Sequence, residues 1–300
     1  MAATGLVSSV VFHEEGVYFC VSQQLYYMAR PSTSTLGASI LGGLLNVVVI
    51  FAVLAHIDYP TLSVATGTAV VATTGFALGF IAIFVTVHTR LLSPAIGYLA
   101  VLAGTTYLAL STPQPEWGEL NGHIIVDGPT HVLSYANSWY VWLALVLYVG
   151  VIEFGFRRGY GIGDHRLRNL PDLPLSRWTI AWVSAGFAGL IGVTTVLVIF
   201  QTGIRLSAAD VIFVVFIAAV AAIPLVAILR YGVLLPAVLF GVFVSYMLTS
   251  GVFVTTESPV HILLFGPYAI VLVLAWVVES ALRSRFRGWN GGRFTAKVVD

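Results

Sequence analysis

Eight apolar blocks, each close to the length that crosses a bilayer, run along the chain from residue 37 to residue 282. An α-helix needs about 20 apolar residues to span a bilayer core. This chain is 58% hydrophobic and only 9% charged, which is more apolar surface than one water-soluble core can bury. The sequence therefore predicts an all-α, polytopic membrane bundle with spans near 37–56, 65–87, 91–111, 137–156, 178–200, 208–229, 232–250 and 261–282.

The basic residues indicate how these spans are threaded. When the spans alternate and the loop 157–177 is placed inside, every one of the 14 Lys and Arg residues except Arg205 falls on the inner side. Cytoplasmic loops retain Lys and Arg, so we expect a cytoplasmic C-terminus in a plasma membrane. The preference for Arg over Lys, with the high Ala, Gly and Val content, indicates a GC-rich prokaryotic genome.

The segment 6–29 leaves the span count open. It is long enough to span, but it holds His13, Glu14 and Glu15, and one acid near mid-bilayer costs roughly 2.5–3.5 kcal/mol. If it spans, the chain has nine spans; if it lies in the interface, the chain has eight. In a span, this cluster would suit a proton path or a pair of metal ligands, because its proton affinities would be coupled in a low dielectric. On the surface it would be a solvated face.

The same segment carries one short likeness to a known family. Glu15, Tyr18, Phe19, Tyr26 and Arg30 resemble, in residue type and spacing, the glutamate-bearing third helix of cytochrome oxidase subunit III. The likeness covers about 16 of 300 residues, and the later His-rich signatures of that subunit have no counterpart here. The chain is therefore not assigned to that family.

Matching short stretches suggest an internal repeat. Glu153 followed by Arg157 resembles Glu279 followed by Arg283, and the stretch 91–95 resembles 234–237. A parallel 4+4 duplication would explain these matches, and chance similarity among apolar helices is the rival explanation. Each Glu–Arg pair has the i,i+4 spacing of an interfacial ion pair. The predicted segments are an N-terminal segment, a four-helix half, an Arg-rich loop, a second four-helix half and a basic tail, at 1–36, 37–156, 157–177, 178–282 and 283–300.

A second candidate site lies on the predicted outer side. Imidazole and carboxylate groups together bind divalent metals or relay protons. No HExxH, HxxxH or CxxC spacing accompanies these groups, and histidines are also common at helix ends, so a shared site and separate solvated side chains both remain open. The candidates are His56, Asp58, His123, Asp127, His131, Glu257 and His261.

Three classes of function fit this pattern. The first is a transport or permeation protein, which a polar cavity between the halves would favour and a dry, tightly packed interface would contradict. The second is a membrane-embedded enzyme, or an accessory subunit of a redox complex, that uses the His and acidic clusters. The third is a structural or assembly protein. The sequence assigns no catalytic residue, metal or cofactor. As partners we expect the lipid bilayer and a helix-mediated oligomer or membrane complex, but no nucleic acid.

Overall fold

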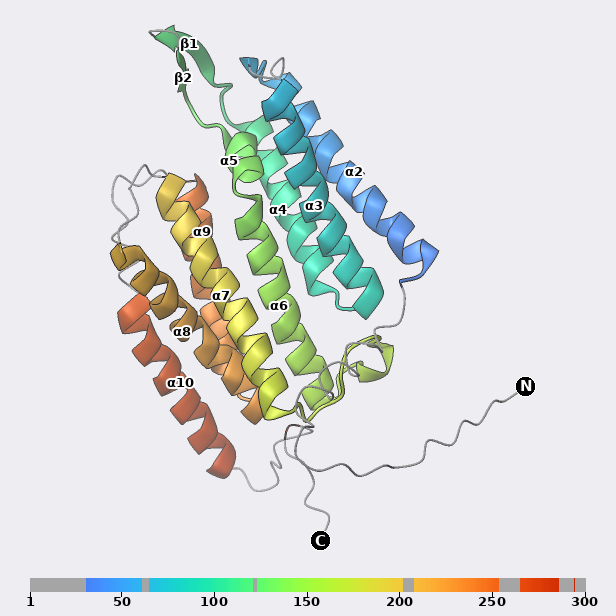
Figure 1. The fold of residues 1–300 in the computed structure, drawn as a ribbon, viewed down its shortest axis with the longest axis vertical. Helices are drawn as coiled ribbons and strands as arrows, with labels where there is room; N and C mark the ends of the chain where they lie inside the picture. Colours follow the sequence, from blue (N-terminus) through green and yellow to red (C-terminus); the bar gives the residue numbers. More distant parts are fainter. Residues whose placement is uncertain are drawn as a thin grey trace, which may run out of the picture. The chain divides into compact units, whose positions relative to one another are not determined.

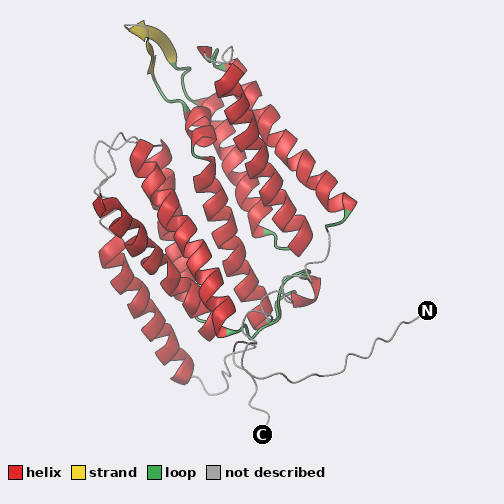
Figure 2. Cartoon of the chain, viewed as in Figure 1, coloured by secondary structure: helices red, strands yellow, loops and turns green. Residues whose placement is uncertain are grey.

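The computed structural model describes residues 31–60, 65–120, 123–201, 208–253, 265–285 and 294. The chain separates into two units, Met1–Ser32 and Thr33–Asp300, and all elements described below belong to the second. Within the described residues this unit is built from α-helices, with a single two-stranded hairpin (Figure 2). The prediction of an all-α bundle is confirmed.

The helices follow the predicted spans closely (Figure 1). Seven of the described helices are long and apolar enough to cross a membrane, and α9 is apolar over Leu235–Ser250. The protein is therefore a multi-pass membrane protein. The bounds are α2 Thr33–His56, α3 Ala65–Thr89, α4 Ser93–Ser111, α5 His131–Asn137, α6 Trp139–Tyr160, α7 Arg177–Gln201, α8 Ala208–Tyr231, α9 Leu235–Phe253 and α10 Phe265–Arg285, with a 3-10 turn at Asp164–Arg166.

The long connection between α4 and α5 holds a hairpin that the span pattern does not predict. Strand β1 (Glu116–Leu120) pairs antiparallel with β2 (His123–Asp127), so that Leu120 faces His123. The dipeptide Asn121-Gly122 between them is the usual sequence signal of a two-residue hairpin. Trp117 anchors β1 to the end of α2 by donating its indole N–H to the Ile57 carbonyl over 2.9 Å.

Glycines allow the closest helix pairs to approach. A Cβ atom built on Gly79 of α3 would lie 2.4 Å from the Gly42 carbonyl oxygen of α2, and one on Gly192 of α7 would lie 2.7 Å from the Val214 carbonyl oxygen of α8. Lipid is as apolar as leucine, so helices in a membrane associate through such close backbone packing rather than through the hydrophobic effect. The pairs α2–α3 and α7–α8 are therefore each fixed by small residues.

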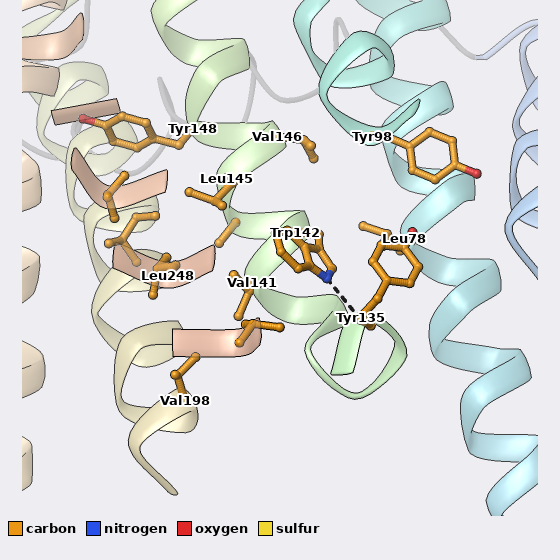
Figure 3. Packing of buried hydrophobic residues seen from close by; sticks show 14 of the residues in the cluster. Leu78, Tyr98, Tyr135, Val141, Trp142, Leu145, Val146, Tyr148, Val198 and Leu248 are labelled. Atoms are coloured by element: carbon orange, nitrogen blue, oxygen red, sulfur yellow. Dashed lines mark hydrogen bonds between the residues drawn. The ribbon is translucent and has the colours of Figure 1, made fainter. Parts of the chain in front are cut away.

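Helix α6 lies at the centre of the bundle. It packs against α3 and α4 on one side and against α7, α8 and α9 on the other. Figure 3 shows Trp142 of α6 beside Tyr135 of α5, with Tyr148 on the opposite side of α6. The Trp142 indole donates to the Tyr135 carbonyl over 3.1 Å. All three side chains are buried in one continuous apolar cluster.

The outward faces of the helices are also apolar. Leu41, Tyr107, Trp182, Ile212 and Ile270 are each exposed over 65% or more of their surface. A water-soluble protein rarely exposes so many large apolar side chains. These faces meet membrane lipid.

Charge separates the two ends of the bundle. All nine arginines among the described residues lie where α3, α6, α8 and α10 end and where α4, α7 and α9 begin. We call this the Arg-rich end, and the end that carries the hairpin the opposite end. The nine are Arg90, Arg157, Arg158, Arg166, Arg168, Arg177, Arg230, Arg283 and Arg285.

Candidate functional site

A glutamate of α6 holds the start of α4. The Glu153 carboxylate accepts the backbone N–H of Leu92 over 3.0 Å and that of Ser93 over 2.7 Å. Its Oε1 also accepts Arg157 Nη1 over 2.9 Å. The first N–H groups of a helix lack intrahelical partners, and no side chain of α4 itself caps this end. Glu153 therefore supplies the cap from another helix, and we call this arrangement the first clamp.

A second clamp repeats the arrangement at the start of α9. The Glu279 carboxylate of α10 accepts the backbone N–H of Leu234 over 3.1 Å and that of Leu235 over 2.6 Å. Arg283, one turn further along α10, pairs with the same carboxylate. Both glutamate side chains are only 15% exposed, so both carboxylates are largely shielded from solvent.

The two clamps match in the backbone that precedes each capped helix. Arg90 after α3 has φ +65°, and Gly232 after α8 has φ +67°. The Arg90 N–H donates to the Thr86 carbonyl and the Gly232 N–H to the Ile228 carbonyl, which is the left-handed ending common at helix C-termini. In each clamp, the first backbone N–H that the glutamate accepts lies two residues after the left-handed residue: Leu92 follows Arg90, and Leu234 follows Gly232.

The clamps differ in how each arginine reaches that left-handed residue. In the first clamp, Arg157 Nη1 donates directly to the Arg90 carbonyl over 2.9 Å. In the second, Tyr160 at the end of α6 donates its hydroxyl to the Gly232 carbonyl, and Arg283 donates to that hydroxyl. The second clamp therefore includes a residue of α6 and joins α10, α8 and α6.

The predicted Glu–Arg pairs are confirmed, and the capping bonds are an addition to them. The spacing within one helix predicts the pair, but it carries no information about a helix start that lies 60 residues earlier in the chain. The sequence did contain a signal for these contacts. The stretch around Glu153 matches the stretch around Glu279, and 91–95 matches 234–237. In each clamp, one stretch of the first match contacts one stretch of the second.

One polar side chain is fully buried in the middle of α2. Asn46 donates its side-chain amide to the Gly75 carbonyl of α3 over 2.7 Å and accepts the Tyr135 hydroxyl over 2.8 Å. Tyr98 of α4 donates to the Gly42 carbonyl of α2 over 3.1 Å. These bonds satisfy the buried groups that they join, so they fix the packing of α2 against its neighbours.

The described members of the predicted outer group are distributed over several elements at the opposite end. His56 is exposed at the end of α2, Asp58 is exposed in the turn that follows it, and Asp127 ends β2. His131 opens α5, and its ring meets Phe253 of α9 edge-on at 5.9 Å. Within the described residues, no three His, Cys, Asp or Glu side chains come close enough to share a metal ion.

Five further members of the predicted sites fall elsewhere. His13, Glu14 and Glu15 of the N-terminal cluster lie outside the described residues. So do Glu257 and His261 of the outer group. The N-terminal cluster, the ninth span and a shared outer site therefore stay predictions.

Described residues line two cavities that bear on the predicted sites. One, of about 390 Å³, opens at the Arg-rich end beside the first clamp. The other, of about 380 Å³, lies among α2, α3 and α5 toward the opposite end. The first is lined by Arg90, Leu92, Arg157, His165, Arg166 and Arg168. The second is lined largely by apolar and small side chains, among them Phe51, Leu54, Val70, Val71 and Leu133.

The contacts of α6 with α7, α8 and α9 form a mostly apolar seam. Tyr148 stacks at an angle on Phe240 of α9 with ring centres 5.4 Å apart, and Gly155 faces Ile228 of α8. Within the described residues, the buried hydroxyls of Tyr148 on α6 and of Ser184 and Thr194 on α7 have no hydrogen-bond partner. Such groups call for an explanation, because an unpaired buried hydroxyl costs free energy.

Comparison of the chain with protein-family models, with curated proteins and with solved structures gave no match.

Proposed function

We propose that this chain is a transport or permeation protein built from two like halves, 37–156 and 178–282. The observation that carries the proposal is the pair of clamps. In each half the last helix bears the glutamate and the third helix receives it, through the same two backbone positions. Transporters are often built from such repeats, with the substrate path at the interface between them.

The unpaired hydroxyls on α6 and α7, two helices that pack against each other, support a path near the seam. Tyr148 and Thr194 are both fully buried, and α6 packs against α7. Water or a polar solute that enters between these helices would satisfy hydroxyls that otherwise have no partner in the described part of the chain. The transport proposal therefore requires the two halves to separate along the seam for part of the time.

The apolar character of the seam favours a second candidate, a structural or assembly protein. Contacts such as Tyr148 with Phe240 and Gly155 with Ile228 are those of a permanent helix interface. If the halves never separate, the seam serves only to hold the bundle together. The two candidates thus differ in one measurable property, the access of water to α7.

Substituted-cysteine labelling measures that access without knowledge of the substrate. In a Cys20→Ser background, we expect Thr194→Cys and Ser184→Cys in native membranes to react slowly with a small, charged methanethiosulfonate reagent. Thr195→Cys is the matched control, because Thr195 is equally buried but donates its hydroxyl to the Ile191 carbonyl. No reaction at Thr194 or Ser184 beyond that at Thr195 would refute transport along the seam and favour the structural role.

The same labelling tests the placement of the protein. We place the Arg-rich end in the cytoplasm of a prokaryotic plasma membrane, because basic loops are retained there. Ile162 lies at this end and is 53% exposed. Ile162→Cys should be protected from an impermeant reagent in intact cells and should react in inside-out vesicles; labelling in intact cells would contradict this orientation.

A further inference from the structure

We infer that the cavity at the Arg-rich end binds a phosphate-bearing anion. The cavity measures about 390 Å³ and lies where α3 ends, α4 begins and the loop after α6 folds back. Of the six described residues that line it, four are arginines, a fifth is His165, and none is acidic. We call it the arginine cavity. This inference does not depend on the transport proposal.

The walls of the arginine cavity are held in place by hydrogen bonds to the ends of two helices. Arg157 donates to the Arg90 and Gly163 carbonyls over 2.9 and 3.0 Å. The Arg168 backbone N–H donates to the Thr89 carbonyl over 3.1 Å, and Asn169 donates its side-chain amide to the His88 carbonyl over 2.9 Å. The loop is therefore fixed to α3 and α6, and the cavity is a built feature of the fold.

Among the residues that the structure describes, three of the four arginines have no acidic partner. Within the described part of the chain, no carboxylate forms an ion pair with Arg90, Arg166 or Arg168. The acids described at this end pair with other arginines: Glu153 with Arg157, Asp164 and Asp172 with Arg158, and Glu279 with Arg283. A phosphate group would offset this concentration of positive charge. The planar guanidinium group matches phosphate through paired N–H donors.

Beside the second clamp, the space next to Gly232, the counterpart of Arg90, is occupied by the side chain of Phe294. Phe294 is only 5% exposed, and its ring lies where a Cβ on Gly159 or Gly232 would be. The Tyr160 ring meets the Phe294 ring edge-on at 5.8 Å. A cavity is therefore not a necessary product of the clamp, and the first clamp is the one that carries both the opening and the arginines.

Arg90 occupies a backbone conformation that suits glycine better. Its φ of +65° is in the left-handed region, where the Cβ of an L-residue is crowded. The equivalent residue of the second clamp is Gly232, at φ +67°. An arginine at this position costs conformational free energy that a glycine would not. Binding of an anion by the Arg90 side chain would offset that cost.

The arginine cavity also has one apolar lining residue. Leu92 lines the cavity and is 58% exposed. Phosphate can reach this place as the headgroup of an anionic lipid or as a free ion from solution. The recognised chemistry is the same in both cases, and the experiment separates the two sources.

The test uses the full-length protein purified in detergent. Native mass spectrometry measures retention of phosphatidylglycerol against phosphatidylcholine, and titration calorimetry measures binding of inorganic phosphate. The test variant is Arg166→Gln/Arg168→Gln. The control is Arg177→Gln/Arg285→Gln, which removes the same charge from exposed arginines at the same end but outside the cavity. Circular dichroism melts confirm that both variants fold.

We expect the cavity variant to lose at least about tenfold in affinity for one of the two probes, the order that two arginines near a membrane surface contribute, while the control changes by less than about threefold. Loss for phosphatidylglycerol alone identifies a lipid headgroup. Loss for inorganic phosphate identifies a free ion. Equal loss in both variants would show general attraction to the basic end and would overturn the inference, as would wild-type protein that binds neither probe.

Discussion

Replacing either clamp glutamate by glutamine should destabilise the protein by a similar amount, although the two residues lie on different helices. Glutamine keeps the size of glutamate but loses its charge and one of its two acceptor oxygens. In each clamp both carboxylate oxygens accept a backbone N–H, over 3.0 and 2.7 Å for Glu153 and over 3.1 and 2.6 Å for Glu279.

The expected size follows from the bonds that are lost. The amide oxygen of glutamine can accept one of the two N–H groups, and the other N–H then faces the NH₂ group and has no partner. A hydrogen bond to a charged group contributes about 1.5–3 kcal/mol, and an unsatisfied buried donor costs about 1–3 kcal/mol. Arg157 keeps two carbonyl partners after the change. We therefore expect a loss of about 2–3 kcal/mol for each substitution.

Unfolding by sodium dodecyl sulfate in mixed micelles, followed by tryptophan fluorescence, gives the free energy of unfolding for each variant. Glu119→Gln is the control, because Glu119 is exposed on β1 and forms no ion pair within the described residues. Surface changes of this kind stay within about 0.5 kcal/mol.

Two results would refute the reasoning. If Glu153→Gln and Glu279→Gln both remain within about 0.5 kcal/mol of wild type, the capping bonds do not stabilise the bundle. If one variant loses stability and the other does not, the two clamps are not equivalent, and the argument for like halves loses its main support.

Two further substitutions test the packing of α2. Gly79→Ala places a methyl group 2.4 Å from the Gly42 carbonyl, so we expect a loss of roughly 1–3 kcal/mol by the same micelle assay; Gly104→Ala, with nothing within 4 Å, is the control, and equal effects would contradict close α2–α3 packing. Asn46→Leu removes the acceptor of the Tyr135 hydroxyl and should cost about 0.6–1.7 kcal/mol, the range of side-chain hydrogen bonds in membranes; a gain in stability would show that the polar group is not structural.

The helices could be predicted from the sequence because the membrane imposes their length. Each block near 20 apolar residues became one long helix, and the described arginines gathered at one end as the charge rule requires. The short helix α5 was not predicted, because seven residues between a hairpin and a span are too few for an apolar period to appear. The hairpin had a local signal in Asn121-Gly122, but apolar length carries no information about it.

The candidate sites were harder to predict, because they depend on contacts between distant parts of the chain. The sequence of α6 alone predicts that Glu153 forms an ion pair with Arg157. The contact with Leu92 depends on how α4 and α6 pack, which the local sequence does not reveal. The outer group was chosen by side of the membrane, and within the described residues no three of its members come close enough to share a metal ion. Sidedness fixes depth in the bilayer but leaves position around the bundle undetermined.

The positions of the clamps along the chain also indicate the order in which they close during membrane insertion. The glutamate that completes the start of α4 emerges from the ribosome about 60 residues after the N–H groups that it receives. The first clamp can then close as soon as α6 has been inserted, before α7 has entered the membrane. The second clamp needs both Glu279 and the earlier Tyr160. The first four spans can therefore assemble alone, whereas the last four finish their assembly on a surface that the first four provide.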